Sequence, residues 1–201
     1  MNRDDLDPLS TALVVFDMLE GYRSRIEESG ALEPTKRLIS ACRARGVPVF
    51  FARADHRDDG ADLNRTITDT DSSFRPWDAA EEQPQRPSLP RSERKVIAEL
   101  GPEPGDYDVP KHRWSAFHQT SLELGLRSRG VDTILLAGGS THVGIASTAF
   151  AARDLDLHVV IVSDACFGFE EQKRFFLEKV FPRMCRVRTS DQAVRMLRGG
   201  P

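Results

Sequence analysis

The stretch VDTILLAGGSTHVGIASTAFAARD, residues 131–154, decides the fold of this chain. Its apolar start is typical of a strand buried on both faces, and the small residues at its end are typical of a helix. Two glycines and the polar residues Ser140, Thr141 and His142 lie between these two parts. A strand, turn and helix in this order present backbone N–H groups and hydroxyls to a cleft. The segment therefore predicts an α/β fold with a ligand-binding turn.

The same alternation of apolar runs and helical patterns continues on both sides of this stretch. TALVVFDM (11–18) and VPVFFA (47–52) predict strands on either side of a helix that contains Leu38, Ile39 and Cys42. About six such alternations predict a three-layer αβα fold, in which helices cover both faces of an open, mainly parallel sheet of about six strands. The other expected strands are 105–110, 131–137, 157–165 and 185–189, and the other expected helices are 91–100, 120–130, 143–154, 170–180 and 190–197. Capping boxes are expected at the start of two of these helices, between Thr120 and Glu123 and between Thr189 and Gln192.

Length, charge and cysteine content limit the class of protein. The 201 residues suit a single domain, 1–201, and the net charge of −3 with mixed signs argues against nucleic-acid and membrane partners. Residues 53–91 form an irregular insertion too long for an ordinary connection. Three widely spaced cysteines suit free thiols in a reducing compartment. With no signal-peptide pattern at the start and no apolar run of membrane-spanning length, a cytoplasmic protein is expected.

The predicted sheet brings several polar residues to one edge. Ligands of open parallel sheets bind outside the carboxyl ends of the strands. Asp17, Asp55 with His56, Lys111, the turn 140–144 and the segment 164–166 all follow predicted strands. Asp17 comes after an apolar run, so partial burial would suit it to proton transfer, although a structural carboxylate that caps a loop is as reasonable.

The segment VPKHRWSAFHQT (109–120) places cations beside aromatic side chains. Such a wall suits a planar carboxylated substrate, which an arginine can hold through two hydrogen bonds. The alternative is a solvated loop whose aromatic residues fill the core. The residues concerned are Lys111, His112, Arg113, Trp114, Phe117 and His118.

Three other chemistries receive little support. Asp55 and His56 are weak candidates for metal ligands, because their spacing matches no specific site, and we expect neither a metal nor a cofactor. A serine hydrolase needs a histidine after Ser140 in the order of the α/β-hydrolases, and the candidate His158 lies inside a predicted strand. No phosphate-binding glycine motif is present.

Taken together, these residues resemble the isochorismatase-like hydrolase superfamily over nearly the whole chain except 53–91. That family combines a strand-end Asp in a pattern like VFDM, a Lys that opens K-x-R-x-S-A-F, and a Cys in G-V-x-T-x-x-C. By resemblance Asp17 and Lys111 fill the first two catalytic places, and Gly144 occupies the cysteine position. The segments 141–144 (THVG) and 111–118 (KHRWSAFH) are closest to the isochorismatases, including those of siderophore and phenazine biosynthesis.

The resemblance implies vinyl ether hydrolysis of isochorismate or an analogue to pyruvate and a dihydrodiol, with Asp17 as proton donor. Lys111 would favour the ionised carboxylate, and an anionic substrate that engages the lysine would favour the neutral acid. The resemblance also implies a cis Gly139–Ser140 bond and a homodimer or homotetramer. The expected substrate-binding residues are Leu19, Tyr22, His56, Arg113, Trp114, Phe117, Gly139, Ser140, Thr141, His142 and Val143.

Two alternatives remain open on the sequence. Leu19 and Ser140 stand where the isochorismatases have Gln and Tyr, and the residues after His56 are more like the amidase branch. One alternative is therefore a C–N hydrolase in which Asp17 activates water, with or without a metal at His56. The other is a catalytically silent relative kept as an oligomer or binding module.

Overall fold

A six-stranded parallel sheet forms the centre of the protein in the computed structural model, which describes residues 5–63 and 89–197. The strands lie side by side in the order β3-β2-β1-β4-β5-β6, and all five pairings are parallel. The predicted αβα fold is confirmed. The strands are β1 (Thr11–Phe16), β2 (Val49–Ala54), β3 (Tyr107–Lys111), β4 (Thr133–Gly138), β5 (His158–Cys166) and β6 (Arg186–Arg188).

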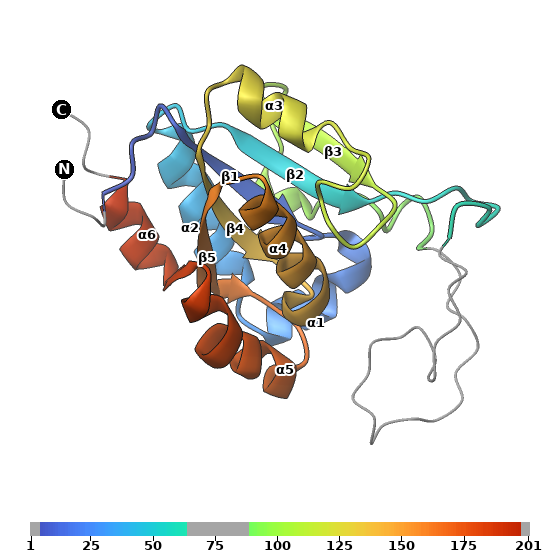
Figure 1. Ribbon diagram of the computed structural model, residues 1–201. Helices are drawn as coiled ribbons and strands as arrows, with labels where there is room; N and C mark the ends of the chain where they lie inside the picture. The colour runs from blue at the N-terminus through green and yellow to red at the C-terminus, as the bar shows by residue number, and fades with distance from the viewer. Residues whose placement is uncertain (1–4, 64–88, 198–201) are drawn as a thin grey trace.

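Helices cover both faces of the sheet (Figure 1). One face carries α1 (Arg23–Glu28), α2 (Leu32–Arg43) and α6 (Ser190–Met196), and the other carries α3 (Leu122–Ser128), α4 (Ala146–Asp154) and α5 (Glu170–Phe175). Short turns of 3-10 helix lie at Glu20–Tyr22, Ala98–Leu100 and Phe181–Arg183, and wider π turns at Thr141–Ile145 and Phe176–Val180.

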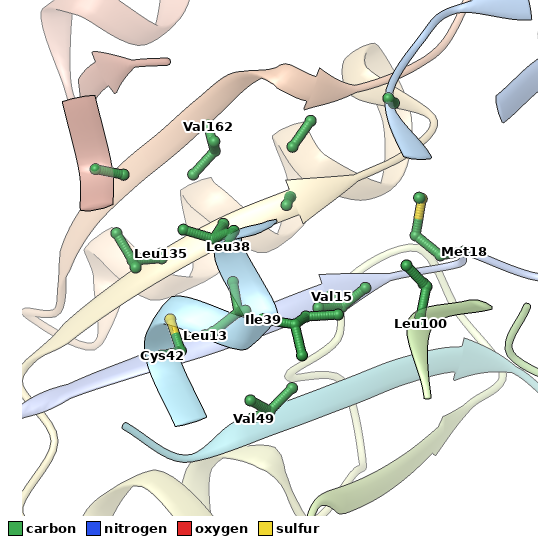
Figure 2. Close-up of a cluster of buried hydrophobic side chains, with 14 of the residues drawn as sticks. Leu13, Val15, Met18, Leu38, Ile39, Cys42, Val49, Leu100, Leu135 and Val162 are labelled. Atoms are coloured by element: carbon green, nitrogen blue, oxygen red, sulfur yellow. The ribbon is translucent and has the colours of Figure 1, made fainter. Parts of the chain in front are cut away.

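The apolar residues of the strands alternate between two cores. Leu13 and Val15 of β1 pack toward α2, where Figure 2 shows them with Leu38 and Ile39. The residues between and beside them, Ala12, Val14 and Phe16, belong to the cluster under α3 and α4. This alternation follows from the two-residue period of a strand, and it places Phe16 on the α4 side of the sheet.

The order of the strands fixes where a ligand can enter. The chain leaves β1 toward β2 and leaves β4 toward β5, so the connections diverge between two neighbouring strands. Ligands of open α/β sheets bind at such a point, in a crevice outside the carboxyl ends of the strands. Asp17 follows β1 and the turn 139–144 follows β4, so both lie where this crevice is expected.

Two predictions of local structure are wrong. Residues 91–100 form turns and a short 3-10 turn, because the segment pairs with the chain after β1 through the antiparallel bridge Leu19–Val96. The capping box expected at Thr120 and Glu123 is absent: α3 starts after Ser121, and Glu123 binds Arg127 at 2.7 Å instead. The second capping box, between Thr189 and Gln192, is confirmed at the start of α6.

The irregular insertion predicted at 53–91 is described in part. Residues 55–63 and 89–91 are irregular, and 53 and 54 belong to β2, whereas 64–88 lie outside the described residues. Within the described ranges, no helix has both the length and the apolar character needed to span a membrane.

Candidate active site

Asp17 occupies a strained and well-defined position at the end of β1. Its φ angle of 48° lies in the left-handed region, which side chains other than glycine rarely adopt. Backbone hydrogen bonds hold it there, because its N–H donates to the Ala52 carbonyl at 2.8 Å and its carbonyl accepts from the Leu19 N–H at 2.9 Å. The side-chain Oδ1 accepts from the Ala54 N–H at 2.6 Å. Residues of β1 and β2 therefore fix this carboxylate at the carboxyl edge of the sheet.

Lys111 completes the pair from the other side. It is the last residue of β3, only 5% exposed, and its Nζ donates to Asp17 Oδ2 at 2.7 Å. The ammonium group also lies 4.2 Å from the centre of the Phe16 ring, over its face. In a site this dry, opposite charges attract strongly, and neither partner can be removed without leaving the other uncompensated. The two predicted catalytic residues are thus in direct contact.

The turn after β4 closes the crevice. Gly138 has φ of +112°, and a Cβ atom there would lie 1.9 Å from the Phe16 carbonyl oxygen, so only glycine fits. The Gly139–Ser140 peptide bond is cis, as the resemblance implies. Thr141 is fully buried, and both its N–H and its hydroxyl donate to the Phe167 carbonyl, at 2.9 and 2.8 Å. Thr141 therefore fixes the turn.

Gly144 lies beside Phe16, in the turn that leads into α4. A Cβ atom at Gly144 would lie 2.2 Å from Cε1 and 2.6 Å from Cζ of the Phe16 ring. These distances are far below van der Waals contact. The position that holds cysteine in the resembling enzymes therefore has no room for any side chain while the Phe16 ring stays where it is.

No other cysteine of the chain replaces the missing nucleophile. Burial raises the pKa of the Cys42 and Cys166 thiols to about 12, and that of the Cys185 thiol to about 11. The thiolate, not the thiol, is the nucleophile, so all three groups are inert near neutral pH. Cys166 is completely buried and packs in the core under α3 and α4.

A second group of polar side chains lies close to Lys111, because His112 follows Lys111 in sequence and the charge of Lys111 acts on His56. His56 Nδ1 is 3.5 Å from Asp62 Oδ1, and His112 Nδ1 is 3.1 Å from Asp62 Oδ2. One ligand atom from each residue lies within 4.8 Å of the others, so the three could hold a metal ion. Burial lowers the pKa of His56, with the charges of His112 and Lys111 acting in the same direction and Asp62 opposing them. A neutral imidazole is the form that binds metals.

We call His56, Asp62 and His112 the rim. Two arginines bind the backbone of the rim through hydrogen bonds to carbonyl oxygens. Arg94 is buried, and its guanidinium donates to the His56 carbonyl and, at 2.8 Å, to Asp58. Arg113 donates to the Asp62 carbonyl at 2.9 Å.

Asp55, named with His56 as a weak metal candidate, is not in the rim. Its carboxylate lies 3.1 Å from Arg53 and 3.7 Å from Arg94. The carboxylate that meets His56 is that of Asp62. Asp55 therefore does not join His56 as a candidate metal ligand, because two arginines already compensate its charge.

The remaining predicted substrate-binding residues differ in their burial and in their neighbours. Leu19 is fully buried, and Tyr22 packs 6.5 Å from the Phe167 ring. Trp114 is half exposed, and Phe117 packs against the core under α3 and α4. His142 lies against the rings of Phe169 and Phe176, with its Nδ1 3.2 Å from the Ser140 hydroxyl.

The turn after β4 offers fewer free donors than predicted. The N–H groups of Thr141, Val143 and Ile145 already donate to the carbonyls of Phe167 and Ser140. His158, the residue that a serine hydrolase would need, starts β5 at the amino edge of the sheet and is exposed. It lies at the opposite edge from Ser140, so the sequence argument against that class holds.

Comparison with known proteins supports the same assignment. Residues 11–192 match the family described as the Isochorismatase domain. The chain belongs to the isochorismatase family. It is 32% identical over 200 residues to YwoC of Bacillus subtilis, an uncharacterized isochorismatase family protein, and the match covers 98% of this chain and 100% of that one. A solved isochorismatase family protein of Burkholderia thailandensis is 31% identical, with a TM-score of 0.83 over 96% of this chain and 97% of the other.

Less similar relatives have names that indicate different reactions. The phenazine biosynthesis protein PhzD1 of Pseudomonas aeruginosa is 27% identical and covers 96% of this chain and 88% of its own. The ureidoacrylate amidohydrolase RutB of Rhizobium rhizogenes is 28% identical and covers 80% of this chain and 71% of its own. Family membership therefore supports a hydrolase and leaves the bond that is cleaved open.

Sequence reasoning missed one residue of this site and did not single out a second one from its neighbours. Phe16 is one more apolar residue in a buried run, and nothing in the sequence indicates that its ring meets both Gly144 and Lys111. Asp62 is one of four acids in the segment 54–62, so its choice over Asp55 depends on the path of the loop.

Proposed function

We propose that this protein hydrolyses a small anionic metabolite without a nucleophilic side chain, and that the bond it cleaves is the vinyl ether of isochorismate or a close analogue. The products would be pyruvate and a dihydrodiol. The observation that carries this proposal is the contact between Gly144 and the Phe16 ring, which leaves no space for a nucleophile. Vinyl ether hydrolysis needs a proton donor and water, and the buried Asp17–Lys111 pair can supply the proton.

The first step would be proton transfer to the substrate. Asp17 delivers a proton to the terminal CH₂ of the vinyl ether, and an oxocarbenium ion forms at the neighbouring carbon. Lys111 Nζ lies 2.7 Å from Asp17 Oδ2. An anionic substrate that engages the ammonium group brings a negative charge beside Asp17, and like-charge repulsion favours uptake of a proton from water by this carboxylate. After the transfer Asp17 is again a carboxylate, and its negative charge stabilises the adjacent cation.

The second step would consume water. Water adds to the oxocarbenium carbon and gives one proton to Asp17, and the product of this addition is a hemiketal. The hemiketal then breaks its C–O bond to the ring. Its hydroxyl loses a proton and becomes the carbonyl of pyruvate, and the departing ring oxygen gains a proton and becomes the ring alcohol. No bond to the protein forms, in agreement with the steric closure at Gly144.

Pyruvate release from isochorismate tests the proposal, with lactate dehydrogenase as coupling enzyme. We expect turnover by the wild-type protein and a loss of about 10²–10⁴-fold in Asp17→Asn, the range for removal of a general acid. Asp108→Asn is the matched control, because Asp108 is an exposed acid that pairs with Arg53 at the outer strand β3. It should keep full activity. Absence of pyruvate above the Asp17→Asn background, with isochorismate and with its amino analogue, would reject this substrate class.

A second candidate function rests on the rim. His56, Asp62 and His112 could hold a divalent metal ion, which would supply an activated water for hydrolysis of a C–N bond. The similarity to an amidohydrolase, RutB, is compatible with this chemistry. Metal content by mass spectrometry and loss of amide hydrolysis with a chelator distinguish this candidate, since vinyl ether cleavage by Asp17 needs no metal.

The third candidate, a catalytically silent relative, is less well supported by the site. A buried ion pair is costly to keep unless it has a use, and Asp17 and Lys111 are in contact in a strained, specific geometry. Equal, zero turnover in wild type and Asp17→Asn across vinyl ether and amide substrates would favour it. A single domain, assembly as a homodimer or homotetramer and a cytoplasmic location stay predictions.

A further inference from the structure

The steric limit at Gly144 comes from a side chain and not from the backbone. Gly144 lies in the helical turn Thr141–Ile145, where any residue can adopt the backbone conformation. This differs from Gly138, whose positive φ and contact with a backbone carbonyl exclude every side chain. At Gly144 the obstructing atoms, Cε1 and Cζ, belong to the Phe16 ring. The choice of glycine therefore depends on the residue at position 16.

The Phe16 ring is held in place from two sides. It is 1% exposed and belongs to the core under α3 and α4. Its edge faces Gly144, and one of its faces carries the Lys111 ammonium, 4.2 Å from the ring centre. Lys111 is bound in turn to Asp17. A cation over an aromatic face is stabilised most where water is excluded, as it is here.

We propose that Phe16 is a positioning and specificity-determining residue of this site. Its ring fills the volume that a nucleophile at position 144 would need, and its face orients the Lys111 ammonium toward Asp17. The inference rests on the proposed nucleophile-free function and extends it. Phe16 and Gly144 together exclude substrates that require a covalent acyl-enzyme. For substrates that are cleaved after protonation, the Phe16 ring positions Lys111 beside the proton donor Asp17.

A thermal double-mutant cycle tests the steric part without any substrate. Gly144→Ala adds a single Cβ atom, and Phe16→Val removes the ring while keeping a residue suited to a buried strand. We expect Gly144→Ala to lower Tm by at least about 6 °C in the wild-type background, because overpacking of a well-packed core is destabilising. In the F16V background the same substitution should leave Tm unchanged or raise it. An equal loss of Tm in both backgrounds would overturn the proposal.

Thiol reactivity gives a second, independent measurement. We expect F16V/G144C to react with iodoacetamide at pH 7.5 at least tenfold faster than G144C, measured by intact mass with the wild type as background for the native thiols. The thiol at the start of a helix and near Lys111 should then be activated. If G144C is insoluble and F16V/G144C is soluble, the proposal is supported as well. Equal reactivity of a soluble G144C and the double variant would contradict it.

The positioning part is tested by the pH profile of pyruvate release. Phe16→Leu keeps apolar bulk and removes the aromatic face. Phe50→Leu is the matched control, because Phe50 is also a fully buried strand residue but stacks on Tyr107 and not under Lys111. We expect a lower kcat and a displaced pH–rate profile for Phe16→Leu only. Identical profiles for the two variants would overturn this role. If the wild type releases no pyruvate, the proposed function fails, while the thermal and thiol measurements still decide the steric part.

Discussion

The floor and the rim of the crevice are built in different ways. The floor, Phe16, Asp17, Lys111 and Gly144, is almost completely buried, and strand ends and backbone hydrogen bonds position it. The rim, His56, Asp62 and His112, comes from a loop and from the residue after β3, and its side chains are 21%, 24% and 50% exposed. In the floor each group touches a partner fixed by the sheet. In the rim the partners are side chains on irregular backbone.

This difference indicates a division of labour. Groups on rigid elements hold a geometry precisely, which proton transfer requires, whereas loops carry the variation that adapts one fold to many ligands. We infer that the floor sets the type of reaction and that the rim sets the substrate. Substitutions in the floor should therefore change the free energy of unfolding by more than substitutions in the rim.

The largest effect is expected at the backbone of the floor. Gly138→Ala would place a Cβ atom 1.9 Å from the Phe16 carbonyl oxygen, at a φ of +112°. We expect a loss of more than about 4 kcal/mol in the free energy of unfolding, measured by urea denaturation, or loss of soluble protein. Gly130→Ala is the control, because Gly130 has φ of +67° and open space around it, so about 1–2 kcal/mol is expected. Similar losses for both would show that the floor is not tightly packed.

An intermediate effect is expected for the charges of the floor. Asp17→Asn keeps the shape of the side chain and leaves the Lys111 ammonium buried without an opposite charge. We expect a loss of about 3 kcal/mol in urea denaturation, and the double variant D17N/K111M should recover part of it. Asp108→Asn, on an exposed pair, should change stability by less than about 1 kcal/mol. A negligible effect of Asp17→Asn would mean that water reaches the pair.

The smallest effect is expected at the rim, as a pH dependence. The pKa of His56 is lowered below its ordinary value of 6.5, chiefly by burial. Between the lowered pKa and 6.5 the unfolded chain binds more protons at this residue, so its contribution to the free energy of unfolding falls as pH falls. The Tm advantage of wild type over His56→Gln should therefore shrink from pH 8 to pH 5. A constant difference would show that His56 titrates as a solvated residue.

The architecture could be predicted because apolar periodicity determines it. Buried parallel strands read as continuous apolar runs, so the six strands and the meeting of Asp17 with Lys111 at one edge of the sheet followed from the sequence and the resemblance. The helix expected over 91–100 failed for a tertiary reason. Its backbone bonds the chain after β1, with Ile97 N–H donating to the Met18 carbonyl, and its Arg94 is buried among carbonyl and carboxylate oxygens.

The details of the site depended on contacts across long sequence distances. The encounter of Phe16 with Gly144 joins β1 to the turn after β4, and the choice of Asp62 over Asp55 depends on how Arg53 and Arg94 bind the latter. Neither contact has a local sequence pattern. Motifs located the catalytic edge, and only side-chain packing identified which neighbours define its chemistry.

The interlock of Phe16 and Gly144 also has a consequence for the history of such a protein. A single mutation that introduces a cysteine at position 144 collides with the ring, and a single mutation that removes the ring weakens the core before any thiol is present. Each one-step path thus crosses a variant less fit than either end point. The two positions are therefore expected to be epistatic, because a cysteine at position 144 needs a second change at position 16.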